Sequence, residues 1–147
     1  MIASLAGVAD YLDALAEHHL SDPPNDPHAR TVAVFDVIAQ HEATLAQRIV
    51  DFLKTKRNVR LIGPANSDAD KRVATFSFTV DTHKSSEIPP LTTADWVALS
   101  SGHFYAKRLV KAVGITNADD GVVRASLAHY TSKNDVDKLI SILDRIL

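Results

Sequence analysis

The chain has 147 residues, of which 46% are hydrophobic and 23% are charged, and its formal net charge is −2. This length is typical of a single domain, and this composition is that of an ordinary globular chain, so neither a disordered segment nor a coiled coil is expected. The small negative charge provides no positive field for a phosphate backbone, which argues against nucleic acid as a partner.

Cysteine is absent from the sequence, which excludes disulfides, thiolate nucleophiles and thiolate metal sites. The N-terminal segment is apolar but lacks the basic residues of a signal peptide, and no later run is long enough to span a membrane. We therefore expect a cytoplasmic protein with no membrane partner.

Two helices are predicted in the first part of the chain. From Ile2 to about His19, apolar residues recur at steps of three and four, which is the pattern of an amphipathic helix. A loop with three prolines follows at residues 21–28, and residues 29–56 form the longest helical pattern. Because Met1 leaves almost no room for a capping residue, we expect the first helix to start where a longer chain has been cut.

Short strands and helices follow in the second part. Strands are predicted at four places: residues 59–62, residues 72–80, the residues after Leu99, and residues 121–129. Helices are predicted at residues 104–113 and from Ser132 onward. Asp135 completes a capping-box pattern with Ser132 at the start of the last helix. Pro89 and Pro90 are expected to end a helical turn begun at residues 82–88. The order predicts an α/β fold, a two-layer α/β sandwich with a small mixed or antiparallel sheet of about four strands covered by helices.

His103 and Arg124 stand out because both lie near strand ends, where short loops present side chains to a cleft. Arg124 interrupts the apolar strand Val122–Ser126, and a guanidinium is costly to bury unless it meets an anion, for which a carboxylate suits its fork. An internal salt bridge or an exposed sheet face would explain the same arginine, and the residues alone leave these alternatives open.

The remaining histidines predict no metal site. His18 and His19 end a helix, where the helix dipole favours solvated histidines, and neither a third histidine nor an acid stands at a ligand spacing. The sequence also contains no glycine-rich phosphate loop and no Ser/His/Asp spacing, so no catalytic residue is predicted.

Two segments resemble a known family. GHFYAKRLVKAVGI (residues 102–115) and DGVVRASLAHYTSKNDVDKLISILDRI (residues 120–146) are similar to the C-terminal end of class V aminotransferases, particularly the cysteine-desulfurase-like branch. In that family a strand with a VRxSLxxYN-type motif precedes an EEVDxLxxxL helix, and residues 121–146 follow this pattern almost continuously.

The resemblance implies the small C-terminal domain of a fold-type I pyridoxal 5'-phosphate (PLP) enzyme. Arg124 aligns with the arginine that binds the substrate α-carboxylate, and His103 aligns with the first histidine of a GHHC-type loop that overhangs the cofactor. Phe104 and Tyr105 stand at the second histidine and the cysteine of that loop. A phenol cannot accept sulfur, so persulfide-forming desulfurase chemistry is not expected, and both aromatic rings are expected to cap the cleft.

The Schiff-base lysine of the family, and the acid that pairs with the pyridinium nitrogen, belong to a large domain that this chain lacks. The resemblance therefore implies that residues 1–147 are one C-terminal domain, its helix over residues 1–19 continuing from that large domain. We expect this chain to be a portion of a PLP-dependent enzyme that acts on an amino-acid-type substrate. Alone, the chain is expected to bind no PLP and to be inactive. It is expected to form a homodimer or to dock to a large PLP-binding domain. A non-catalytic dimerisation or binding module is the alternative, and transamination, elimination and sulfur removal stay open as reactions.

Overall fold

The structure is a computed structural model that describes residues 2–147, with side chains from residue 5 onward. The expectation about Met1 lies outside the described residues. The chain divides into two units, Met1–His41 and Glu42–Leu147, and each is described by itself. Among the residues that the structure describes, no helix combines the length and the apolar content that crossing a bilayer requires.

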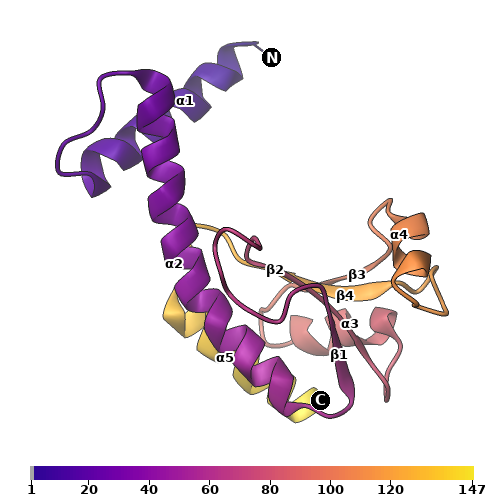
Figure 1. Ribbon diagram of the computed structural model, residues 1–147. Helices are drawn as coiled ribbons and strands as arrows, with labels where there is room; N and C mark the ends of the chain where they lie inside the picture. Colours follow the sequence, from indigo (N-terminus) through magenta and orange to yellow (C-terminus); the bar gives the residue numbers. More distant parts are fainter. Residues whose placement is uncertain (1) are drawn as a thin grey trace. The chain divides into compact units, whose positions relative to one another are not determined.

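The first unit is a pair of helices joined by the proline loop. α1 (Ile2–His19) confirms the predicted helix, and α2 (Pro27–Thr55) begins in this unit and continues into the next (Figure 1). α2 starts at a proline because the first turn of a helix needs no donor from that residue. The carboxylate of Asp26 accepts a hydrogen bond of 2.8 Å from the backbone of Ala29, which caps the helix.

The second unit contains an antiparallel sheet in the strand order β1-β2-β4-β3. Its strands are β1 (Val59–Ile62), β2 (Thr75–Val80), β3 (Ser100–Gly102) and β4 (Val122–Ser126). This confirms the predicted α/β fold with a small sheet of four strands, and it resolves the choice between mixed and antiparallel pairing in favour of antiparallel.

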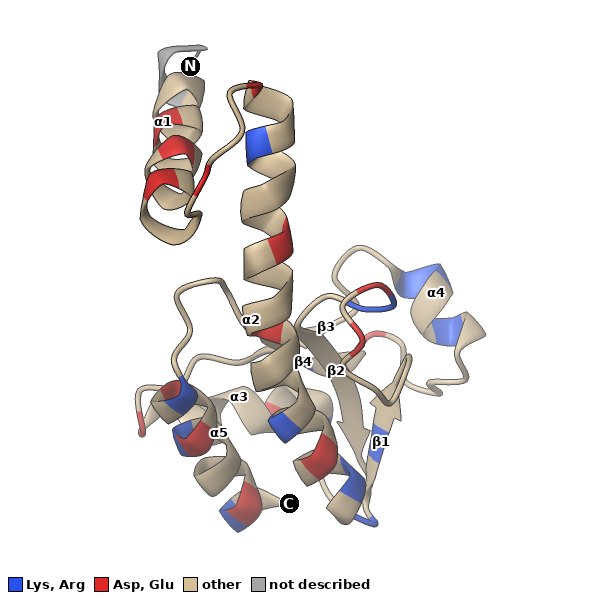
Figure 2. Ribbon diagram, turned by 60° about the vertical axis from the view of Figure 1, so that its left-hand side comes forward, with Lys and Arg blue, Asp and Glu red and all other residues tan. Residues whose placement is uncertain are grey.

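One face of the sheet forms the hydrophobic core. Side chains alternate along β2, so that Phe76 and Phe78 are fully buried, whereas their neighbours are only half-buried. They pack with α5 (Lys133–Ile146) and with residues 45–53 of α2. Arg48 of α2 forms an ion pair with Asp137 of α5, and Lys56, the residue after α2, pairs with Asp144 at 2.7 Å. Figure 2 shows the mixed charges along both helices. The capping box of α5 is confirmed, since the Ser132 hydroxyl accepts a hydrogen bond of 3.2 Å from the Asp135 amide.

The structure corrects several element predictions. β2 begins at Thr75 and not at residue 72, and β4 spans Val122–Ser126 and not residues 121–129, because the pairing of the two strands starts at Thr75 and Ser126. Pro89 and Pro90 do not end a helical turn; they lie in the first turn of α3 (Ile88–Thr93), which follows a short 3-10 helix, η1 (Ser85–Glu87). Proline is tolerated there because first-turn amides have no partner inside the helix. α4 (Lys107–Ala112) begins three residues later than predicted, since Phe104 and Tyr105 have φ values of 48° and 62° and cannot be helical.

Candidate functional site

Arg124 lies in the middle of β4, on the sheet face opposite the core. Its neighbours Val123 and Ala125 are buried in the core, so the alternation of the strand turns the arginine to the other side, where it is half-buried. The register places Ser77 of β2 and Ser100 of β3 directly beside it. Because both neighbours are small, the guanidinium is not screened by long side chains of the adjacent strands.

The guanidinium of Arg124 contacts an aromatic ring and no anion. Its central carbon, Cζ, lies 3.8 Å from the centroid of the Phe104 ring, a cation–π contact. Across the part of the chain that the structure describes, Arg124 joins none of the ion pairs and its N–H groups donate to no acceptor. The internal salt bridge considered from the sequence is therefore not formed, and the donors of this half-buried arginine remain available.

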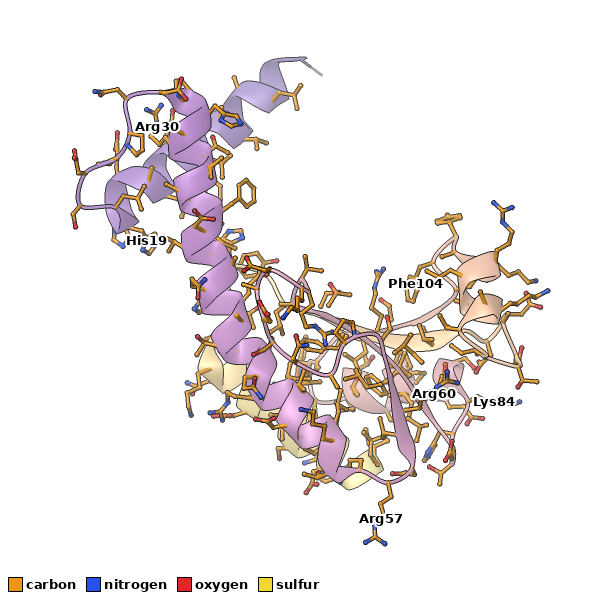
Figure 3. All side chains as sticks on the ribbon, viewed as in Figure 1. His19, Arg30, Arg57, Arg60, Lys84 and Phe104 are labelled. Atoms are coloured by element: carbon orange, nitrogen blue, oxygen red, sulfur yellow. The ribbon has the colours of Figure 1, made fainter. Side chains whose placement is uncertain are left out.

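Arg124 and His103 line the same pocket, which has a volume of about 200 Å³. Ser77 and Phe104 also contribute to the wall, and Phe104 is labelled in Figure 3. The rest of the wall is apolar and comes from α4, its flanking residues and two strands: Ile62, Ala106, Leu109, Val110, Val113, Ile115 and Val122. The pocket thus has a few polar groups in an apolar surface, as small-molecule sites commonly do.

The imidazole of His103 carries an unpaired polar atom. Its Nδ1 is buried and has no hydrogen-bond partner among the residues that the structure describes. A buried nitrogen without a partner costs free energy, and such atoms in folded proteins call for an explanation, of which a missing ligand or water is one. His103 and Arg124, which line one pocket, thus each carry polar atoms that no described residue satisfies.

A close approach of two glycines brings the His103 loop to β4. Gly121 has φ +69°, and a Cβ atom built on it would lie 2.1 Å from the carbonyl carbon of Gly102. Only a glycine lets these two backbones meet, because any side chain would clash with the peptide that leads into His103. The glycine before β4 therefore sets the position of the histidine relative to the strand that carries the arginine.

Two other cations near the pocket, Arg60 and Lys107, already have partners. Arg60 donates through Nη1 to the carbonyl of Gly114 at 3.4 Å and through Nη2 to that of Val113, which holds the C-terminal end of α4. Lys107 pairs with Asp119, and this hydrogen-bonded ion pair lowers the pKa of the carboxyl group. Among the described side chains, Arg124 is thus a cation on the pocket wall that has neither an ion-pair nor a hydrogen-bond partner.

The two aromatic residues after His103 do different things. Phe104 lies on the pocket wall and stacks on Arg124, as expected for a residue that caps the cleft. Tyr105 is fully exposed and does not line the pocket, so the expectation that it caps the cleft is wrong. Both residues have left-handed backbone conformations, which send consecutive side chains in different directions.

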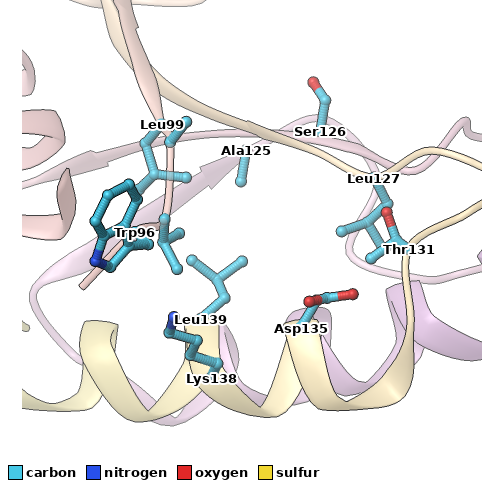
Figure 4. Close-up of a pocket in the computed structure, with 11 residues that line it drawn as sticks. Trp96, Leu99, Ala125, Ser126, Leu127, Thr131, Asp135, Lys138 and Leu139 are labelled. Carbon is cyan, nitrogen blue, oxygen red and sulfur yellow. The ribbon is translucent and has the colours of Figure 1, made fainter.

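A second pocket of about 220 Å³ lies between α5 and the segment before β3 (Figure 4). Trp96 lines it with a side chain that is 92% exposed, and no sequence pattern had singled this residue out. The pocket also contains Asp135, but this carboxylate accepts hydrogen bonds from the backbone and hydroxyl of Ser132 as the cap of α5. The carboxyl group of Asp135 is therefore occupied in the capping box of α5. The pocket with Arg124 is the stronger candidate for a functional site.

Comparison with known proteins identifies the class to which this fold and pocket belong. The family model for class-V aminotransferases matches residues 31–139. The chain belongs to the class-V aminotransferase family, whose members depend on PLP.

Among its relatives, the aminotransferase-like protein FGM3 of Gibberella zeae is 37% identical over 114 residues, which cover 77% of this chain and 28% of that protein. A probable cysteine desulfurase of Pseudomonas putida is 29% identical over 144 residues, covering 98% of this chain and 30% of the relative. The chain therefore spans less than a third of the length of these relatives.

Solved structures share the fold. A cysteine desulfurase from Thermococcus onnurineus, solved in its apo form, superposes with a TM-score of 0.66 at 22% identity over 82% of this chain and 29% of that chain. The cysteine desulfurase CsdA from Escherichia coli gives a TM-score of 0.61 at 23% identity over 86% of this chain and 31% of its own.

The pocket around Arg124 does not fit PLP by itself. The cofactor needs a lysine amine for its Schiff base and an acid for its ring nitrogen. Neither a lysine nor a carboxylate is among the described residues that line this pocket. The described lining therefore lacks both of the groups that this cofactor needs.

Proposed function

We propose that this chain is the C-terminal, substrate-binding portion of a PLP-dependent class-V aminotransferase or cysteine-desulfurase-like protein that acts on an amino-acid-type substrate. Arg124 binds the substrate carboxylate, and His103 borders the substrate in the same pocket. One observation carries this proposal: the guanidinium of Arg124 is half-buried in a pocket and meets no anion among the described residues.

The surroundings of Arg124 favour a carboxylate. A guanidinium presents parallel N–H donors that match the two oxygens of a carboxylate, and such charge-assisted pairs are among the stronger hydrogen bonds. The apolar wall lowers the local polarity around the half-buried guanidinium and so strengthens the attraction between the charges. The Phe104 ring stacks on the guanidinium and limits its motion, so less orientational freedom is lost on binding.

Catalysis requires groups from outside this pocket. Since the pocket offers no amine for a Schiff base, the chain alone is proposed to hold no PLP and to be inactive, and a large PLP-binding domain supplies the cofactor. Tyr105 stands where the resemblance places a cysteine, and its phenol cannot form a persulfide, so the reaction does not pass sulfur through this residue.

The test is a titration of the ¹⁵N-labelled chain with pyruvate, followed by NMR. We expect saturable shifts of backbone amides in β4 and residues 102–106 that disappear in Arg124→Gln. Arg108→Gln is the matched control, because Arg108 is an exposed arginine of α4 that does not line the pocket, and it should bind pyruvate like the wild type. Unchanged shifts in Arg124→Gln would refute the role of this residue.

A second measurement tests the cofactor. The purified chain is incubated with PLP, reduced with borohydride and examined by mass spectrometry. We expect no stoichiometric adduct on any single lysine. A one-to-one adduct would show that the chain holds the cofactor without a large domain.

Exposed apolar side chains favour the alternative, a non-catalytic dimerisation or binding module. Within the first unit, Leu5 and Phe35 are 68% and 54% exposed, and Val8 and Val32 are also exposed. Such side chains can be buried against a second copy of the chain or against a docked domain. Light scattering separates the two functions: a tight symmetric dimer that binds neither pyruvate nor PLP supports the module.

A further inference from the structure

We propose that the pocket selects a monocarboxylate with a branched apolar tail. This inference rests on the proposed function, because it assigns the carboxylate to Arg124. It adds the chemistry of the rest of the ligand, which follows from the walls of the pocket and from the charges around it.

The walls provide an apolar slot between α4 and the open face of the sheet. Leu109, Val110 and Val113 contribute from α4 and the residue after it, and Ile62 and Val122 contribute from β1 and β4. Arg124 lies on the same wall, so a ligand whose carboxylate meets the guanidinium has apolar surface around its tail. The volume of the pocket, about 200 Å³, exceeds the roughly 150 Å³ of an apolar cavity that can hold benzene, so a branched aliphatic group fits.

A second charged group on the ligand finds no counter-charge in this slot. Lys107 is paired with Asp119, and Arg60 is bonded to the carbonyls of Val113 and Gly114. A second carboxylate would have to lose its hydration beside aliphatic side chains, which is costly. His103 is the other titratable group on the pocket wall. If a dicarboxylate used His103 to bind more tightly than the apolar monocarboxylate, the proposal would be wrong.

A free ammonium group is disfavoured for the same reason. No carboxylate is among the described residues that line the pocket, so the ammonium of a free amino acid meets no anion there. We therefore expect this chain to bind an apolar acid more tightly than the corresponding amino acid.

The experiment is isothermal titration calorimetry of the chain with acetate, 4-methylpentanoate, L-leucine and succinate. Each buried methylene is worth about fourfold in affinity, so 4-methylpentanoate should bind at least about tenfold more tightly than acetate even in a half-open pocket. L-Leucine, which carries the same tail with an ammonium, and succinate should both bind more weakly than 4-methylpentanoate.

Two variants connect the preference to the slot. Leu109 lines the pocket yet is 63% exposed, so Leu109→Ser should fold normally; it should weaken 4-methylpentanoate several-fold and leave acetate unchanged. Leu91→Ser is the matched control, because Leu91 is an exposed leucine of α3 that does not line the pocket. This control should bind both acids like the wild type.

The outcomes separate this inference from the proposed function. If acetate and 4-methylpentanoate bind equally and both need Arg124, or if succinate binds most tightly, the apolar preference is wrong and the carboxylate site stands. If 4-methylpentanoate binds Arg124→Gln as well as the wild type, the pocket is apolar but the proposed role of Arg124 is wrong. If none of the acids binds, both proposals fail.

Discussion

The Phe104 ring covers the Arg124 guanidinium in a cation–π contact, with 3.8 Å between the guanidinium carbon and the ring centroid. The two residues come from different elements, since Phe104 lies in the loop before α4 and Arg124 lies in β4. The ring fixes the plane of the guanidinium and leaves its N–H edges free, so it orients the donors without neutralising them.

Removal of this ring should weaken carboxylate binding. In Phe104→Leu the guanidinium loses a contact worth about 0.5–2 kcal/mol and regains freedom that a ligand must then remove, so affinity for 4-methylpentanoate should fall about threefold to tenfold. Calorimetry measures this change. Tyr105→Leu is the matched control, because Tyr105 shares the left-handed backbone conformation but is fully exposed, and it should leave the affinity unchanged. Equal losses in both variants would assign the effect to the loop backbone.

The close contact between Gly121 and Gly102 predicts a large loss of stability in Gly121→Ala. The new Cβ would lie 2.1 Å from the Gly102 carbonyl carbon and would also occupy a left-handed conformation. We expect the free energy of unfolding in urea to fall by about 3 kcal/mol or more. Gly63→Ala is the control, since Gly63 has φ +93° with nothing within 4 Å, and it should cost only about 1–2 kcal/mol. Similar losses would mean that the two backbones separate easily.

Local patterns in the sequence predicted most elements of the fold. The helices α1, α2 and α5 follow from apolar periodicity, and the Ser132–Asp135 capping box indicates the start of α5. The strands β1, β2 and β4 follow from short runs rich in β-branched and apolar residues, whereas β3 (Ser100–Gly102) contains no apolar residue. The prolines of α3 predict a helix end from residue type alone, but Pro89 and Pro90 lie in the first turn of the helix, where proline is accepted. Strand pairing could not be predicted, since it depends on contacts between residues far apart in the chain.

The candidate site was only partly predictable. His103 and Arg124 were expected to share a cleft, and the structure places both in one pocket. The apolar wall was not expected, because Ile62 lies about sixty residues from Arg124 in the sequence and reaches the pocket only through the pairing of β1, β2 and β4. The contrast between Phe104 and Tyr105 depends on backbone angles that residue types alone do not specify.

Asp120 predicts a dependence of stability on pH. Burial raises the pKa of this carboxyl, but hydrogen bonds from the Ser86 hydroxyl and from the backbone amides of Ser85 and Ser86 lower the pKa by more, and the net pKa is below its usual value. A folded pKa below the unfolded value near 3.9 stabilises the folded state above about pH 4, and this contribution is lost as pH falls through the folded pKa.

The corresponding variant is Asp120→Asn. At neutral pH it should be less stable to urea than the wild type, and the difference should shrink as the pH is lowered below about 4, because the wild-type carboxylate then becomes protonated. Asp36→Asn, at an exposed position of α2, should match the wild type at neutral pH. A difference for Asp120→Asn that stays constant from pH 7 to pH 2 would contradict this account.

Arg30 should control the opening of the proline loop in the first unit. Its Nε donates to Asp13 at 2.7 Å, and its Nη1 donates to the carbonyls of Pro24 and Asn25 at 2.9 and 3.3 Å, so one side chain ties α1 and the loop to the start of α2 (Figure 3). A lysine keeps the charge but lacks the fork that reaches these acceptors together. In Arg30→Lys we expect proteolysis within residues 21–26 to accelerate about twofold to fivefold, since cleavage needs local opening.

Arg57→Lys, at an exposed arginine that projects away from the chain, should be cleaved in this loop at the wild-type rate. If Arg30→Lys is also cleaved at that rate, the ion pair with Asp13 is enough to hold the loop and the carbonyl contacts are dispensable.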